Sequence, residues 1–360
     1  MCCTDSHAAR RRESAPAHGR HDCRPEKCLL PNPLRQVPVS SLREGRGLRH
    51  LELQGLSLAC TEARLLSHLL PCATSLTSLS LHANRLDGLA LQHLAPAIRV
   101  CRCLRTINLA NNRLGAEGAA FLACALQTSD TVTALNLDDN YLASAAFLEP
   151  ADLSPLCALI ETSHTLASLR LRKNCLDEQA MAQLASGLAA SRSLTELHLG
   201  YNYLSAEAVV HVAGALLTNR TLRTLDLQAN NVTNYGHELH GLRQLCTSLE
   251  ANATLRHLNL DNNDLRAEGA AMVAQALTTN STLRELCLES NGLEDEGASA
   301  VADVLRRRVH TMSLQVWMRC NHVAQETREA VGQSIDARRG VTLHLEGGHH
   351  IADSIGFTVT

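Results

Sequence analysis

The chain has 360 residues, 45% of them hydrophobic, and its charge is nearly balanced at 33 basic against 36 acidic residues. This hydrophobic content excludes a wholly disordered chain, and no apolar run approaches the roughly 18 residues that a membrane span needs. The apolar stretch of a signal peptide is also missing from the Arg-rich beginning.

The first segment in chain order, residues 1–47, differs in charge from the rest. It holds nine Lys or Arg and five Asp or Glu, which leaves 24 basic and 31 acidic residues elsewhere. We expect a basic, disordered tail followed by an acidic body. A nucleic-acid-binding body would be basic, so nucleic acid is not an expected partner. The 14 cysteines, without a secretory signal, are typical of reduced thiols, and we expect a cytoplasmic protein, with the nucleus as the alternative.

A repeat occupies residues 48–339. The chain has 64 leucines but only one Trp, four Tyr and three Phe, and the leucines recur in the pattern Leu-x-x-Leu-x-Leu-x-x-Asn-x-Leu. Copies of the pattern begin at residues 48, 76, 104, 132, 166, 194, 222, 255, 283 and, in degenerate form, 313. Six of the nine intervals between these starts are 28 residues long. Such self-similarity is the signature of a repeat protein whose units stack on their neighbours.

Each unit is predicted to contain a strand and then a helix. Alternating leucines give way to apolar residues spaced by three and four, as in the helical stripe Ala298, Val301, Ala302 and Leu305. Longer connections at Ala143–Asp152 and Thr233–Gly241 are predicted to be insertions between strand and helix. Residues 340–360 are expected to hold a strand at 341–345 that caps the exposed sheet edge, and a short tail.

Two sets of asparagines recur with the repeat. One follows each strand by three residues, and an amide there can satisfy the backbone groups that the strand leaves unpaired. The other set, within Asn-x-Ser/Thr sequences at Asn219, Asn252 and Asn280, occupies one repeat position just before the next strand. We therefore expect the first set to have a structural role and the second to be a by-product of the repeat rather than a set of glycosylation sites.

The leucine spacing, the asparagine and the repeat length resemble the ribonuclease-inhibitor type of leucine-rich repeat. This class is also found in Ran GTPase-activating protein and in the C-terminal domains of NOD-like receptors. The resemblance implies an α/β solenoid, a horseshoe of about ten repeats of about 28 residues. Its parallel β-sheet would be concave and its helices convex.

The candidate binding residues gather in repeats four to seven. Strand residues between the leucines are expected to face water on the concave side. Tyr and Arg are enriched at binding hot spots, and loop insertions on one face of a solenoid commonly mark its binding face. The predicted partner-binding residues are Tyr141, Arg170, Arg172, Lys173, His198, Tyr201, Tyr203, Tyr235 and Trp317.

Structural interpretations of the same residues remain open. Arg172 could pair with Asp138 of the neighbouring strand, the tyrosines could stack along the rim, and Trp317 could pack against the C-terminal cap. An acidic stretch at the C-terminal end would suit a basic partner segment, as the basic residues of repeat five would suit an acidic one. Its members are Asp226, Asp261, Asp264, Glu285 and Glu289.

These observations predict a monomeric, non-enzymatic scaffold or regulator that binds one or more proteins and needs no cofactor and no metal. Phosphate-binding, zinc-protease and serine-hydrolase motifs are missing from the sequence. The resemblance offers two alternatives. One is activation of GTP hydrolysis on a small GTPase, and the other is enzyme inhibition in the manner of ribonuclease inhibitor.

Overall fold

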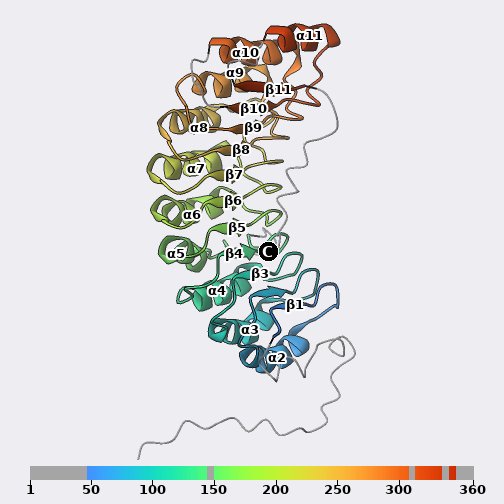
Figure 1. Ribbon diagram of the computed structural model, residues 1–360, viewed down its shortest axis with the longest axis vertical. Helices are drawn as coiled ribbons and strands as arrows, with labels where there is room; N and C mark the ends of the chain where they lie inside the picture. The colour runs from blue at the N-terminus through green and yellow to red at the C-terminus, as the bar shows by residue number, and fades with distance from the viewer. Residues whose placement is uncertain (1–46, 144–149, 308–312, 335–339, 346–360) are drawn as a thin grey trace, which may run out of the picture.

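The computed structural model describes residues 47–143, 150–307, 313–334 and 340–345. Within these residues, strands and helices alternate along the chain and form two layers stacked along one axis (Figure 1). The stack curves so that the helices lie on its outer side and the strands on its inner side. No helix in the described part of the chain is both long and apolar enough to span a membrane.

The strands are short because only the alternating leucine segment of each repeat is extended. They are β1 (His50–Glu52), β2 (Ser78–Ser80), β3 (Thr106–Asn108), β4 (Ala134–Asn136), β5 (Ser168–Arg170), β6 (Glu196–His198), β7 (Thr224–Asp226), β8 (His257–Asn259), β9 (Glu285–Cys287), β10 (Leu314–Trp317) and β11 (Val341–His344). All pair in parallel, in one sheet whose strand order is the chain order.

A helix follows each of the first ten strands. The helices are α2 (Cys60–Leu69, with a 3-10 turn η2 at Leu70–Cys72), α3 (Gly88–Val100), α4 (Gly115–Leu126), α5 (Ser154–Thr162), α6 (Glu178–Ala190), α7 (Ala206–Thr218), α8 (His240–Ala251), α9 (Arg266–Ala276), α10 (Glu294–Arg307) and α11 (Gln325–Ser334). Side-chain caps start several of them, as where Asp177 accepts a hydrogen bond of 3.0 Å from the Ala180 backbone N–H.

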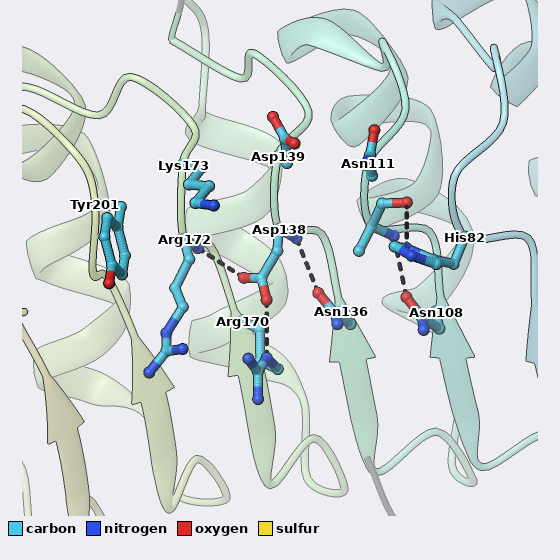
Figure 2. Close-up of a pocket in the computed structure, with 11 residues that line it drawn as sticks. His82, Asn108, Asn111, Asn136, Asp138, Asp139, Arg170, Arg172, Lys173 and Tyr201 are labelled. Carbon is cyan, nitrogen blue, oxygen red and sulfur yellow. Dashed lines mark hydrogen bonds and ion pairs between the residues drawn. The ribbon is translucent and has the colours of Figure 1, made fainter. Parts of the chain in front are cut away.

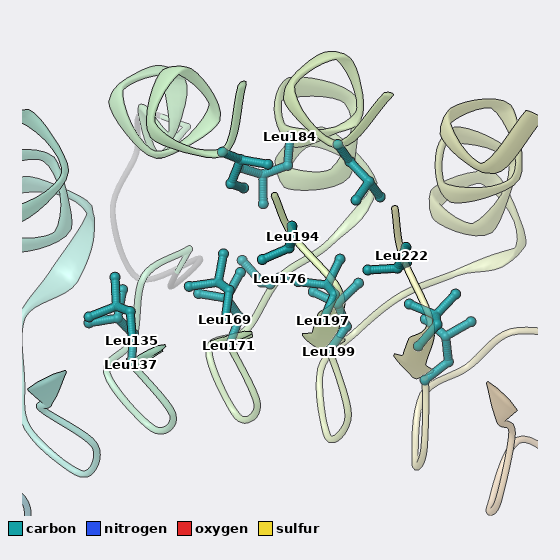
Figure 3. Packing of buried hydrophobic residues seen from close by; sticks show 14 of the residues in the cluster. Leu135, Leu137, Leu169, Leu171, Leu176, Leu184, Leu194, Leu197, Leu199 and Leu222 are labelled. Atoms are coloured by element: carbon teal, nitrogen blue, oxygen red, sulfur yellow. The ribbon is translucent and has the colours of Figure 1, made fainter. Parts of the chain in front are cut away.

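The core lies between the two layers and consists of the repeat leucines. The central residues of neighbouring strands pair directly, as Leu169 does with Leu197 and Leu197 with Leu225. Figure 3 shows how leucines from strands and helices meet in this space, including Leu184 of α6 above the strand leucines. The stripe Ala298, Val301, Ala302 and Leu305 is buried in α10, which confirms the predicted strand-then-helix unit.

The first asparagine set joins each strand end to its neighbours. Asn202 is typical: its Nδ2 donates to the carbonyl oxygens of Leu171 and Leu199, at 3.0 and 2.8 Å. Its Oδ1 accepts from the backbone N–H groups of Asn174 and Leu176. The predicted structural role of these asparagines is therefore confirmed.

The second asparagine set does the same where each helix ends. Asn219 is fully buried; its Nδ2 donates to the Leu188 carbonyl oxygen at 2.7 Å, and its Oδ1 accepts from the Leu222 backbone N–H at 2.8 Å. Asn252 and Asn280 are also buried and make equivalent bonds. Their side chains therefore stabilise the repeat, a role that their recurrence alone did not indicate.

The predicted capping strand is present. β11 pairs in parallel with β10, with Val341 opposite Leu314 and His344 opposite Trp317. The edge of β10 is thereby covered, which satisfies backbone groups that would otherwise be open to pairing with another chain.

Candidate functional site

All four tyrosines are exposed side chains that lie beyond the carboxyl ends of strands in the middle of the sheet. Tyr141 follows β4, Tyr201 and Tyr203 follow β6, and Tyr235 follows β7. Their exposed fractions are 52%, 41%, 69% and 64%, respectively. We call these four residues the tyrosine rim. Leucines fill the core, so the tyrosines are not needed for packing there and present aromatic surface to the solvent.

The backbone around Tyr201 and Tyr203 is held by the repeat. The Tyr201 N–H donates to the Gln228 carbonyl oxygen at 2.7 Å, and the Tyr203 N–H donates to the Leu176 carbonyl oxygen at 2.9 Å. The φ angle of Tyr201 is +56°, in the left-handed region. The rim residues therefore extend from a fixed backbone.

The loop that carries Tyr235 is anchored to the next repeat. Thr233 is fully buried, and its hydroxyl donates to the carbonyl oxygens of Asn263 and Asp264, each at 3.0 Å. The same hydroxyl accepts from the Gly236 N–H at 3.0 Å. This insertion lies between β7 and α8, as predicted, and its anchor fixes the turn that contains Tyr235.

Arg170 and Asp138 form an ion pair beside the rim (Figure 2). Arg170 Nε donates to Asp138 Oδ2 at 2.9 Å, and the Arg172 backbone N–H donates to Asp138 Oδ1 at 2.7 Å. Both carboxylate oxygens of Asp138 are thus engaged by β5 and the residues that follow it.

The Arg172 side chain pairs with Asp226, whereas a pairing with Asp138 was one interpretation that the sequence left open. Arg172 is 6% exposed, and its Nε donates to Asp226 Oδ2 at 2.7 Å, across β6 to the end of β7. Gly200 lies on this route; a Cβ there would stand 3.2 Å from Asp226 Oδ2. The glycine therefore leaves room for the bridge. His198 is also buried, with Nδ1 3.5 Å from Asp226 Oδ2.

Part of the acidic stretch is buried, so the expectation of water-exposed strand residues fails there. Asp226, Asp261 and Glu289 are each at most 3% exposed. Burial, together with the neighbouring charges of Glu289 and Asp226, raises the pKa of Asp261 to about 8. Burial opposes ionisation of Asp226 as well, but the nearby His198 side chain and the charge of Arg172 outweigh burial and lower its pKa.

A polar hollow of about 380 Å³ opens on the concave face at the ends of β2 to β6. We call it the strand-end hollow; Figure 2 shows the side chains that surround it. Its lining residues are His82, Asn108, Ala110, Asn111, Asn136, Asp138, Asp139, Arg170, Arg172, Lys173 and Tyr201. Lys173 lies at the edge of the hollow, with Nζ 5.3 Å from the centre of the Tyr201 ring.

The hollow adds residues that were not among the predicted binding residues. Asn108, Asn136 and His82 belong to the strand positions between and just after the leucines, the same register as Arg170 and Arg172. That register was the available signal. It placed these residues on the concave face, but they were not chosen because tyrosine and arginine are the usual hot-spot residues.

Trp317 lies apart from the rim, on β10. Its ring stacks on His344 of the capping strand, with centroids 3.5 Å apart, and its Nε1 donates to Glu285 Oε1 at 3.0 Å. The Arg319 guanidinium covers the ring at 4.4 Å from the centroid. This is the packing arrangement that the sequence left open beside ligand binding.

No metal centre is evident among the residues that the structure describes. In that part of the chain, no three His, Cys, Asp or Glu side chains gather in a way that could hold an ion. The site consists of the tyrosine rim, the strand-end hollow and the buried Arg172–Asp226 bridge.

Comparison with known proteins supports the repeat class. A family model described as "Leucine Rich repeat" matches residues 100–123, 218–236, 251–274 and 279–302. Among curated proteins, none matches this chain.

Solved structures include two similar chains. A structure of the leiomodin-1 actin-binding site 2 is 22% identical, with a TM-score of 0.30, over 36% of this chain and 71% of that chain. An internalin from Listeria monocytogenes is 15% identical, with a TM-score of 0.41, over 86% of this chain and 89% of that chain. Similarities this low carry no information about what this chain binds. The matched repeats, the parallel sheet in chain order and the asparagines that join each strand end to its neighbours together show that the chain folds as an α/β leucine-rich repeat solenoid.

Proposed function

We propose that this protein is a non-enzymatic scaffold or regulator that holds a partner protein against the tyrosine rim and the adjoining strand-end hollow. The observation that supports the proposal is the exposure of all four tyrosines beyond the carboxyl ends of β4, β6 and β7. Tyrosine buries much apolar area on binding and also carries a hydroxyl for hydrogen bonding, and it is enriched at binding hot spots.

A rigid rim favours tight binding. Association costs free energy whenever loops and side chains must be ordered, and a surface that is already ordered avoids part of that cost. Here the backbone N–H groups of Tyr201 and Tyr203 are bonded to neighbouring repeats, and Thr233 anchors the turn of Tyr235. The proposed partner thus meets a pre-organised surface.

The buried residues of the predicted site take a supporting role in this proposal. Arg172 and His198 are at most 6% exposed, and both lie at Asp226. They stabilise the strand ends from which the rim extends, while Arg170 and Lys173 line the strand-end hollow, where they can contact the partner. Trp317 secures the capping strand and is not part of the proposed contact.

We further propose that the repeats are of the ribonuclease-inhibitor type. The 28-residue interval and a helix of nine or more residues in each repeat support this subtype. We expect the protein to act as a monomer in the cytoplasm or nucleus; the covering of the β10 edge by β11 supports the monomer.

Affinity purification with quantitative mass spectrometry tests the role of the rim. The full chain and a Tyr201→Ala/Tyr203→Ala variant would be compared as baits in cell extract under reducing conditions. Both side chains are exposed, so their truncation should leave the fold intact. At least one protein retained by the wild type should fall about tenfold or more with the variant, since a hot-spot residue contributes 2 kcal/mol or more.

The matched control removes exposed apolar surface elsewhere. Leu89 and Val100, at the two ends of α3, are 56% and 51% exposed, and neither belongs to the rim. A Leu89→Ala/Val100→Ala variant should retain the same proteins as the wild type. An unchanged set of partners with the folded tyrosine variant would refute the proposal.

A further inference from the structure

The hydrogen-bonding groups of the strand-end hollow are unequally distributed between donors and acceptors. The Asp138 carboxylate is occupied on both oxygens, by Arg170 Nε at 2.9 Å and by the Arg172 backbone N–H at 2.7 Å. Asp139 also lines the hollow, but its carboxylate points away from Arg170 (Figure 2). Of the two carboxylates that line the hollow, that of Asp138 is therefore engaged on both oxygens.

Two side-chain amides present donors to the hollow. Asn108 Oδ1 accepts from the Ala110 backbone N–H at 3.1 Å, and Asn136 Oδ1 accepts from the Asp138 backbone N–H at 2.9 Å. Because these bonds fix the oxygens toward the backbone, each Nδ2 group is what the amide offers to a ligand. The two residues are paired neighbours on β3 and β4, so the donors lie side by side.

A cation completes this set of donors. Lys173 is exposed, at the edge of the hollow, and its ammonium lies 5.3 Å from the Tyr201 ring centroid. A contact with the face of a ring leaves ammonium N–H groups to donate elsewhere. The hollow thus combines an ammonium with two amide donors, and it adjoins the tyrosine rim through Tyr201.

The arginines favour a carboxylate over a phosphate ester as the ligand group. Phosphate sites typically use bidentate arginines. Here Arg170 is engaged with Asp138, and Arg172 reaches away across β6 to Asp226. One ammonium and two amides match the charge and the acceptor number of a single carboxylate.

We propose that the strand-end hollow binds the side chain of an Asp or Glu in the partner, and that the residues flanking this acid pack on the tyrosine rim. This inference rests on the proposed function and specifies the chemistry of the partner. From β4 to β7 there are three strand spacings, about 14 Å, which about five extended residues span. A linear acidic segment is therefore long enough to occupy both surfaces.

Two peptide libraries test the preference for an acid. Phage-displayed random peptides of about twelve residues, with Glu fixed at the centre of one library and Gln at the centre of the other, would be selected on the full chain. The Glu library should be enriched on the wild type, and this enrichment should be lost with Tyr201→Ala/Tyr203→Ala. The best sequence would then be synthesised with Glu, Gln or phosphoserine at the centre.

Isosteric variants of the hollow give the sharpest readout. Asn136→Asp keeps the oxygen that accepts from Asp138 but replaces the Nδ2 donor with a repelling oxygen. It should weaken the Glu peptide about tenfold and change the affinity of the Gln peptide by less than about twofold. Lys173→Gln should weaken the Glu peptide about threefold to fivefold, while Lys173→Arg should retain it.

A remote variant controls for net charge. Asn262 precedes Asn263 in repeat eight, as Lys173 precedes Asn174 in repeat five. Asn262→Asp should leave the affinity for both peptides unchanged. Thermal melts of every variant verify that it is folded.

The outcomes separate the two proposals. Peptides that need the tyrosines but are enriched equally from both libraries, or that Asn136→Asp weakens equally with Glu and Gln, would overturn the acid site and leave the scaffold function standing. Tighter binding of the phosphoserine peptide than of the Glu peptide would likewise overturn the preference for a carboxylate. Enrichment from neither library, or enrichment independent of the tyrosines, would overturn both proposals.

Discussion

At the scale of single residues, Tyr201 occupies a backbone position that suits its side chain poorly. The residue before each asparagine of the first set, the ladder asparagines, is left-handed. In three other repeats this position holds Asn111, Asp139 or Asn262, and in the remaining ones Ala83, Lys173, Ala229, Ser290 or Cys320. Asn and Asp tolerate this conformation, whereas a bulky side chain there costs about 1–2 kcal/mol. A strained tyrosine at a surface position is consistent with selection for contact rather than for stability.

Replacing Tyr201 with Asn should therefore stabilise the fold and weaken binding. Relief of backbone strain should exceed the loss of the Lys173 cation–π contact, about 0.5–1 kcal/mol, for a net gain of up to about 1 kcal/mol. Chemical denaturation measures the gain, and affinity purification measures the loss. Tyr203→Asn is the control, because Tyr203 has no positive φ and should gain no stability. An unstabilised Tyr201→Asn protein would contradict the strain argument.

At the scale of the repeat element, the ladder asparagines should matter more to stability than any neighbouring polar residue. Asn263 is 1% exposed, and its Nδ2 donates to the carbonyl oxygens of Leu227 and Leu260 at 2.9 and 3.0 Å. Asn263→Ala would strand these buried groups, and we expect a loss of about 3 kcal/mol in the free energy of unfolding. The adjacent Asn262 is exposed, and Asn262→Ala should cost about 1 kcal/mol or less. Equal losses in denaturant titrations would contradict the ladder's role.

The buried acids of β7 to β9 should make stability depend on pH. Asp261 has a folded pKa of about 8 against an ordinary value of 3.8, so between these values the folded protein holds a proton that the unfolded chain releases. Stability should therefore fall as the pH rises from about 4 to about 8. The lowered pKa of Asp226 acts in the opposite sense, and its contribution is lost as the pH falls below about 4.

Asp261→Asn should remove most of the slope between pH 5 and pH 8. An Asn oxygen can still accept from the Glu289 backbone N–H, which lies 2.6 Å from Asp261 Oδ1, and an amide has no proton to lose. Thermal melts at several pH values should show the variant more stable than the wild type at pH 8, by about 2 °C or more. Parallel melting profiles for the two proteins would show that Asp261 does not carry the effect.

The sequence predicts contacts between adjacent repeats better than contacts that skip a repeat. Contacts along the core follow from apolar periodicity, so the burial of Leu258 and Leu286 and their pairing could be foreseen. The bridge from Arg172 to Asp226 could not, because it skips a strand and depends on the missing side chain of Gly200. Neighbour rules consider adjacent strands and therefore favoured Asp138.

At the scale of the whole molecule, the stacked repeats should not all unfold together. Each repeat contacts mainly its neighbours, so a terminal repeat is stabilised from one side only. Trp317, the single tryptophan of the chain, lies in β10 near one end of the sheet. Its fluorescence therefore reports the stability of the C-terminal repeats, whereas circular dichroism reports that of all helices.

The fluorescence transition in denaturant should thus occur at a lower concentration than the circular-dichroism transition. His344→Ala removes the stacking partner of Trp317 on the capping strand, and it should shift the fluorescence midpoint further while moving the circular-dichroism midpoint less. Asn262→Ala, outside this end, should leave the gap between the two midpoints unchanged. Superimposable curves in the wild type and in His344→Ala would indicate one cooperative unit instead.

Because the strand order is the chain order, the length of the sheet is set by the number of repeats. Each repeat inserted between Asn140 and Asn230 would lengthen the sheet by one strand spacing, about 4.8 Å, and leave the shape of every loop unaltered. The fit of a partner that spans the tyrosine rim therefore depends on the number of repeats between the tyrosines as well as on the side chains. Changes in repeat number would retune the choice of partner in discrete steps, whereas substitutions within a loop would retune it gradually.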